Sequence, residues 1–164
     1  MSKWLQATLS SLTSLTSLTS KRMNQIARWW HGKGFGIQSR SDYEYLKDVI
    51  KEPLPYYAYE QIKSERARLI YRVCNHDKER KVTLVGTFTP EEQTAARLAL
   101  HHEPDTTPQL AHLHGKETVI VSDITGDNAP LWQMAQEAQA ITWDMGSIGL
   151  VRFVEGRYPE HYVV

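Results

Sequence analysis

Gly86 and Thr87 lie in the stretch of this chain best suited to hold a cofactor. They follow the apolar run 82–85 and precede Thr89-Pro90-Glu91-Glu92, a sequence typical of a capped helix start. In open α/β sheets such a strand–turn–helix unit binds cofactors, and its glycines let backbone N–H groups approach an anionic ligand. Gly86 is the only glycine of this turn, and we expect the two glutamates to lie where the ligand's negative charge would be. The sequence therefore predicts the scaffold of a binding loop whose ligand site is damaged.

Two carboxylates are the next candidates. Asp123 ends the apolar run 117–123 and Asp127 follows soon after, and open sheets place their sites at the carboxyl ends of strands. Helix capping and loop hydrogen bonding explain both residues as well, and we favour that interpretation. If the protein does bind a cofactor, Gly86, Thr87, Asp123 and Asp127 are the residues expected to contact it.

One group of side chains has the composition of a metal site, namely His101, His102, His112 and His114. Two histidine pairs on either side of a short acidic stretch could reach one zinc ion. Their spacing matches no standard structural site and no cysteine lies near them, so we interpret them as surface histidines and predict no metal.

Nucleophilic catalysis has no support in the sequence. Cys74 is the only cysteine, and the apolar helical stretch 69–74 around it predicts a small core residue. No Gly-x-Ser-x-Gly turn is present. We therefore assign no catalytic residue, and the lone cysteine, which allows no internal disulfide, indicates a reducing, cytoplasmic location.

Charge is distributed unevenly along a chain of 164 residues with no net charge. Residues 1–41 carry six basic side chains and no acid, and the remainder carries 13 basic and 19 acidic ones. Solvated surface charge is the favoured interpretation, and binding of a membrane or a nucleic acid through residues 1–41 is the alternative. No apolar run approaches the ~20 residues that would span a bilayer.

The chain divides into a low-complexity Ser/Leu/Thr extension over residues 1–20 and one domain over 21–164. Residues 21–80 of that domain form a helical leader, with a helix capped by Ser41 or Asp42 and a longer helix over 58–75. Residues 81–164 form the sheet.

Apolar runs indicate strands near 82–85, 117–123, 140–143, 149–154 and 161–164, and 101–115 reads as a loop. The first two strands are joined through helical segments and should be parallel, whereas the last three follow short turns and should be antiparallel. The prediction is an α/β fold, a reduced Rossmann-like mixed sheet of about four or five strands with amino-terminal helices and a carboxy-terminal antiparallel hairpin. An exposed sheet edge or the helical leader would suit a homodimer.

Both ends of the domain resemble a known family. Gly34-Phe-Gly-Ile-Gln-Ser39, Tyr43-Glu-Tyr-Leu-Lys-Asp-Val-Ile50 and Pro55-Tyr-Tyr-Ala-Tyr-Glu-Gln-Ile62 are similar to the leader of class I S-adenosylmethionine-dependent methyltransferases of the Bacteroidetes type. Three carboxy-terminal segments resemble that family's late strand and closing hairpin: 119–124, 141–153 and 160–164. Trp132 falls in the helix where the family has a tryptophan. The resemblance covers about residues 21–100 and 117–164, and the order of the motifs is more specific than any one of them.

The chain also departs from that family. Leu84 stands where the family's first strand ends in an acidic residue, and the glycines that help hold the methionine part of the cofactor are missing around Gly86. The acid that would hold the ribose hydroxyls has no counterpart, because only about 17 residues separate Leu100 from the 119 strand. Ser122 replaces one of two late aspartates and Asp123 keeps the other.

These observations lead to three hypotheses. The first is a methyltransferase-like protein of reduced size that lacks competent S-adenosylmethionine binding and acts as a non-catalytic binding or structural domain. The second is a small active methyltransferase that uses S-adenosylmethionine near Gly86, Asp123 and Asp127. The third is an adaptor that associates with a membrane or a nucleic acid through residues 1–41.

Overall fold

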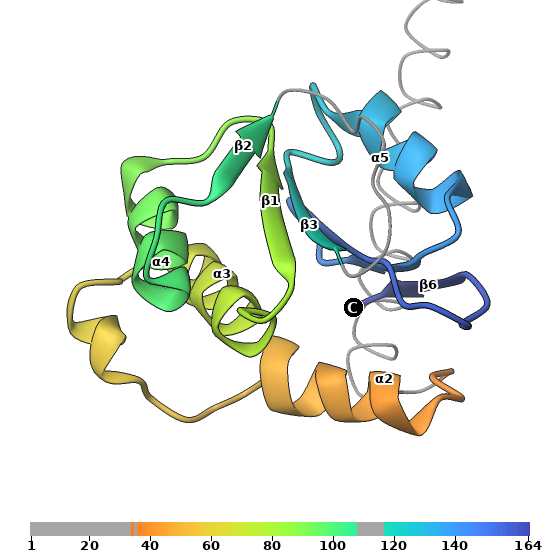
Figure 1. Cartoon of the computed structure of the whole chain (residues 1–164), viewed down its shortest axis with the longest axis horizontal. Coiled ribbons are helices and arrows are strands. Elements are labelled where there is room, and N and C mark those ends of the chain that lie inside the picture. Colours follow the sequence, from red (N-terminus) through yellow and green to blue (C-terminus); the bar gives the residue numbers. More distant parts are fainter. Residues whose placement is uncertain (1–33, 35, 108–116) are drawn as a thin grey trace, which may run out of the picture.

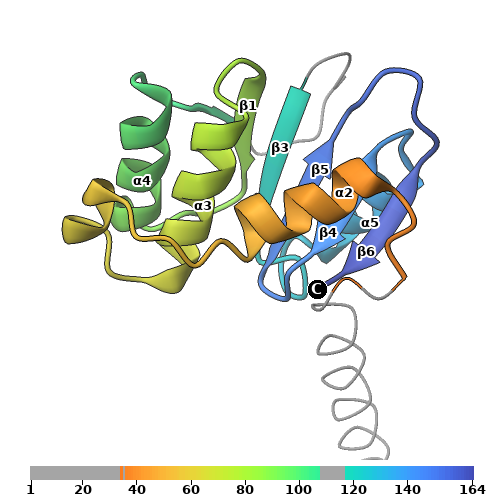
Figure 2. The same cartoon turned by 90° about the horizontal axis from the view of Figure 1, so that it is seen from below.

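The computed structural model describes residues 34, 36–107 and 117–164, which form an α/β fold with helices on both faces of one mixed sheet (Figures 1 and 2). The helices are α2 (Arg40–Tyr45), the π-helix η1 (Leu46–Ile50), the 3₁₀-helix η2 (Tyr57–Glu60), α3 (Glu65–His76), α4 (Pro90–Leu100) and α5 (Ala129–Glu137). The strands are β1 (Lys81–Val85), β2 (Asp105–Thr107), β3 (Glu117–Ser122), β4 (Ile141–Asp144), β5 (Ile148–Arg152) and β6 (Glu160–Val163). The extension predicted over 1–20 lies outside the described residues.

The sheet has the order β2-β1-β3-β5-β4-β6 among the described strands. Strand β1 is parallel to both β2 and β3, which confirms the parallel pairing predicted for the first two apolar runs. Strand β5 is antiparallel to β3 and to β4. The α/β class and the antiparallel β4–β5 hairpin are therefore as predicted.

Two features of the sheet differ from the sequence prediction. The described residues form six strands rather than four or five, because Asp105–Thr107 pairs with β1 within the segment predicted as a loop. Strand β6 pairs with the far edge of β4 and runs parallel to it, so the prediction that the last three strands are all antiparallel is wrong. Residues 153–159 carry the chain past the amino end of β4, to its far side, instead of folding it back along β5.

Each face of the sheet packs against its own helices (Figure 2). Leu84, Ile120 and Leu150 share one core with α2, η1, α3 and α4, whereas Val119 and Val151 share another with α5. This division follows from the alternation of side chains along a strand. The helices of the leader, α2, η1 and α3, thus cover an apolar face that the short sheet would otherwise expose.

On the α5 face, Trp132 packs directly against a glycine in β5. A Cβ atom added to Gly149 would lie 2.3 Å from the Trp132 ring. The tryptophan is 6% exposed, so this close approach of ring and backbone fixes α5 on the sheet.

The helix starts in the leader also differ from prediction. Ser39, not Ser41 or Asp42, caps α2, because the carboxylate of Asp42 is buried and accepts hydrogen bonds from Arg157 (2.6 Å) and Tyr162 (2.9 Å). The helix predicted over 58–75 is divided into η2 and α3.

The interruption between η2 and α3 ends at Ser64. Its hydroxyl caps α3 by accepting a hydrogen bond from the backbone N–H of Ala67 at 3.1 Å. The backbone N–H groups of Lys63 and Ser64 donate to Glu91 of α4. Since those amides are engaged by another helix, α3 begins only at Glu65.

A buried ionic cluster joins the amino ends of the central strands to the leader. Asp77, which is 1% exposed, accepts a hydrogen bond from Thr118 at 2.7 Å and two from the guanidinium of Arg152 at 3.0 and 3.2 Å. His76 lies 2.6 Å from the same carboxylate, and the Arg152 guanidinium stacks 3.9 Å from the Tyr45 ring centroid. Burial alone would raise the pKa of Asp77, but the His76 hydrogen bond, the Arg152 charge and the Thr118 hydroxyl together lower it below its usual value.

Replacing this carboxylate should destabilise the fold in a pH-dependent way. Asp77→Asn leaves the charge of Arg152 buried without its counter-ion, and we expect a loss of about 3 kcal/mol in the free energy of unfolding at pH 7. Because the folded-state pKa is lowered, the carboxylate's contribution is present above the unfolded value of about 3.9 and is lost as the pH falls through the folded value. Urea denaturation at pH 7 and below pH 3 should therefore show a difference from the wild type that shrinks in acid.

The matched control is Asp127→Asn, which removes an exposed carboxylate with no hydrogen bond or ion pair to the described residues. It should leave stability nearly unchanged at both pH values. A loss for Asp77→Asn that stays the same from pH 7 to pH 3 would contradict the role given to the ionised carboxylate.

Candidate functional site

The strand order places a crevice at the carboxyl ends of β1 and β3. The chain passes from β1 to β2 on one side and then to β3 on the other, and open α/β sheets bind ligands where the order reverses in this way. A cavity of about 420 Å³ lies at this position. The residues that line it are Gly86, Thr87, Thr106, Thr107 and Asn128.

Two of the four residues predicted to contact a cofactor, Gly86 and Thr87, are thus brought to the cavity. Thr106 and Thr107 were missed because β2 is short and polar and gives no strand pattern. Asn128 was missed as well, although it is the N-cap residue of α5, and its side chain makes no capping hydrogen bond. The lining is uncharged, so it offers hydroxyl and amide groups rather than an acid–base pair.

The space directly above Gly86 is filled by the chain itself. Gly86 has a φ of 99°, and a Cβ atom there would lie 2.3 Å from Nδ2 of Asn128 and 2.4 Å from Oγ of Ser122. The Asn128 amide donates to the carbonyl of Ser122 at 2.7 Å, which holds it in place. The glycine therefore admits two neighbouring polar side chains where a bound cofactor would approach the backbone.

The two predicted aspartates do not line this cavity. The Asp123 carboxylate accepts a hydrogen bond from the backbone N–H of Asp127 at 2.9 Å, and the Asp123 carbonyl accepts one from Gly126 at 3.1 Å. The loop approaches the carboxylate so closely that a Cβ at Gly126 would lie 2.3 Å from Oδ2. Asp123 thus makes the loop hydrogen bonds that the sequence favoured, and the Asp127 side chain is exposed.

The prediction that Glu91 and Glu92 lie at the ligand's position is wrong. The Glu91 carboxylate accepts the backbone N–H groups of Lys63 and Ser64 before α3, and these hydrogen bonds lower its pKa. Both glutamates point toward α3, which packs against α4: Glu91 meets the amides that precede α3, and Glu92 meets Arg66 within it.

Glu92 has a second structural role. Its carboxylate accepts the backbone N–H of Thr89 at 2.9 Å while the Thr89 hydroxyl accepts that of Glu92 at 3.2 Å, which confirms the predicted capping box. The other carboxylate oxygen lies 2.7 Å from Nε of Arg66 in α3. Glu92 is 3% exposed and the Arg66 side chain 32%, so this partly buried ion pair links the two helices.

The remaining sequence candidates do not form a site among the described residues. His101 ends α4 with a φ of 63°, the exposed His102 bonds the carbonyl of Glu103 at 2.9 Å, and His112 and His114 lie outside the described residues. No group of His, Cys, Asp or Glu in the described ranges is placed to hold a metal ion. Cys74 is buried as predicted, and burial raises the pKa of its thiol to about 12.

Of the basic residues 1–41, the structure describes only 34 and 36–41. The predicted binding of a membrane or a nucleic acid therefore falls mostly on residues outside the described ranges. Within the described part, Arg40 pairs with Glu44 at 2.8 Å. None of the described helices has the length and apolar character needed to cross a bilayer. The edge strands of the described sheet are β2 and β6. The homodimer through a sheet edge or the helical leader stays a prediction.

The position of Glu92 predicts an effect on stability. Glu92→Ala removes the capping box and the Arg66 ion pair and should lower the free energy of unfolding by roughly 2–3 kcal/mol. Glu92→Gln keeps the capping box and should cost less. Urea denaturation of both variants beside Glu137→Ala, an exposed carboxylate near the end of α5, measures the difference. An Ala variant as stable as the wild type would rule out this role.

Comparisons of the chain with protein-family models, with curated proteins and with solved structures give no match.

Proposed function

We propose that this protein is a non-catalytic binding or structural domain, built on a reduced Rossmann-like scaffold of the methyltransferase type. The observation that carries the proposal is the self-filled crevice at Gly86. A cofactor held at a switch point needs backbone N–H groups that it can approach closely, and here Asn128 and Ser122 take that space.

The chemistry of the crevice supports the same proposal. Methyl transfer requires the protein to bind and orient the sulfonium cofactor, which itself supplies the reactivity. Leu84, at the position of the family's acidic residue, is fully buried in the core and offers no ligand group. The Asp123 carboxylate already accepts a hydrogen bond from the backbone N–H of Asp127 in its own loop. Of the acidic groups expected to hold the cofactor, one is therefore replaced by Leu84 and another, Asp123, has one carboxylate oxygen engaged by its own loop.

One observation favours the alternative, a small active methyltransferase that binds S-adenosylmethionine. The cavity of about 420 Å³ lies at the carboxyl ends of β1 and β2, and Gly86 and Thr87 line it. A cofactor would have to displace the Asn128 side chain, or use the threonine side of the cavity.

Calorimetric titration of the full chain with S-adenosylmethionine, and with its demethylated product, separates the two functions. Our proposal predicts no saturable heat at micromolar or low millimolar ligand. Micromolar binding would overturn it. Gly86→Val should abolish such binding, because a side chain at that positive φ would clash with Asn128 and Ser122 and distort the crevice. Circular dichroism of the variant must match the wild type for that conclusion.

A further inference from the structure

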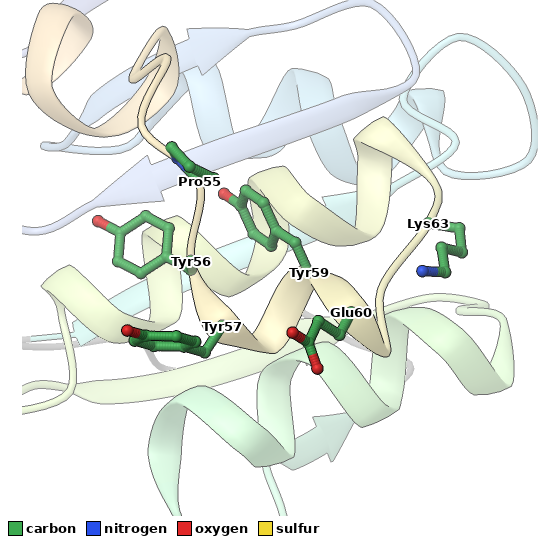
Figure 3. A pocket seen from close by; sticks show the side chains of 6 residues that line it. All are labelled: Pro55, Tyr56, Tyr57, Tyr59, Glu60 and Lys63. Atoms are coloured by element: carbon green, nitrogen blue, oxygen red, sulfur yellow. The ribbon is translucent and has the colours of Figure 1, made fainter.

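A second hollow lies away from the crevice, in the segment between η1 and α3. It measures about 590 Å³ and is shown in Figure 3. We call it the tyrosine hollow, and its lining residues are Pro55, Tyr56, Tyr57, Tyr59, Glu60 and Lys63. Three of its lining residues are tyrosines that lie within four residues of the chain.

Two of these tyrosines have structural partners. The Tyr56 hydroxyl donates to Glu52 at 2.5 Å, and the Tyr59 hydroxyl accepts from Arg72 at 3.1 Å. Their rings also contact each other, with centroids 5.5 Å apart. They form a wall held by hydrogen bonds and ring contacts, and the Tyr59 ring is also contacted by the Arg68 guanidinium, 5.0 Å from its centroid.

The other polar groups of the hollow are not used by the described part of the chain. Tyr57 is 95% exposed and makes no hydrogen bond or ring contact with the described residues. The Glu60 carboxylate and the Lys63 ammonium likewise have no ion-pair partner among them. In Figure 3 the Glu60 carboxylate points toward the Tyr57 ring, and Lys63 lies at the opposite end of the hollow.

This combination restricts the ligand by charge. The free aromatic face of Tyr57 beside a carboxylate favours an alkylated ammonium, which is weakly hydrated and attracted to the ring face. A cation alone would be repelled by Lys63, and an anion alone by Glu60. A small zwitterion with a quaternary ammonium at one end and an anionic group at the other satisfies both charges.

We propose that the tyrosine hollow binds a phosphocholine group, with its trimethylammonium between Tyr57 and Glu60 and its phosphate at Lys63. The inference rests on the proposed function, since it names what a non-catalytic binding domain would bind. The group could belong to a free metabolite or to the headgroup of phosphatidylcholine. Leu54, 63% exposed beside the hollow, adds apolar surface that would suit a lipid interface.

Nuclear magnetic resonance titration of the ¹⁵N-labelled full chain tests the proposal with three ligands: phosphocholine, choline and inorganic phosphate. We expect saturable shifts confined to residues 52–64 with phosphocholine, and weaker binding of the two fragments. Tyr57→Leu should weaken phosphocholine binding about two- to fivefold, whereas Tyr57→Phe keeps the aromatic face and should retain it. Tyr158→Leu, which alters another tyrosine that is 86% exposed, is the matched control and should change nothing.

Charge variants make the test more specific. Lys63→Gln should weaken phosphocholine binding but leave choline binding equal or tighter, and Glu60→Gln should weaken both. Cosedimentation with phosphatidylcholine vesicles distinguishes the sources, since retention that Tyr57→Leu reduces identifies the lipid headgroup, and soluble binding without retention identifies a free ligand.

The proposal is overturned by absence of shifts in residues 52–64 at 10 mM phosphocholine, roughly the weak limit of a specific site, or by binding that Tyr57→Leu leaves intact. Its failure is distinct from failure of the proposed function, because S-adenosylmethionine is titrated against the other cavity. A chain that binds neither ligand would remain a non-catalytic scaffold with the tyrosine hollow wrongly assigned.

Discussion

The carboxylate of Asp77 holds together elements that are far apart in the sequence. It lies between the end of α3 and the start of β1, and it bonds Thr118 at the start of β3 and Arg152 at the end of β5. Burying a charge is costly unless its partners offset the lost hydration, and here several donors and the stacked ring of Tyr45 surround the pair. Because this cluster fixes the amino ends of β1 and β3, their carboxyl ends must lie side by side, and the crevice at Gly86 follows from that register.

The amino and carboxyl ends of the central strands share one property. At both ends, polar groups of the chain make hydrogen bonds with one another. At the amino ends this bonding is ionic and buried. At the carboxyl ends it consists of Asn128 reaching back to Ser122 and of Asp123 accepting amides from its own loop. A site that satisfies its own hydrogen bonds gains little by binding a ligand, because each new contact replaces an existing one. This supports the proposed non-catalytic scaffold, and it contrasts with the tyrosine hollow, where Tyr57, Glu60 and Lys63 make no side-chain hydrogen bond or ion pair to the described residues.

The sequence predicted the elements whose signals are local. Continuous apolar runs located β1 and β3, and Thr89 with Glu92 located the start of α4 with its capping box. It could not locate β2, whose polar residues are stabilised by pairing with β1 rather than by burial, nor the direction of β6, which depends on a connection past the amino end of β4. The partners of Glu91 and Asn128 lie in other elements or across a loop, so residue types alone placed the glutamates in the wrong environment and overlooked the asparagine that fills the crevice.

The central claim is that Asn128 occupies the approach to Gly86 in the folded protein in solution. The most direct measurement is the nuclear Overhauser effect between the Asn128 side-chain amide protons and the α-protons of Gly86. The account predicts a strong cross-peak that persists when S-adenosylmethionine is added. A missing cross-peak, or one that disappears on addition of the cofactor while the Gly86 and Thr87 amides shift, would show that the crevice is open to a ligand and would contradict the account.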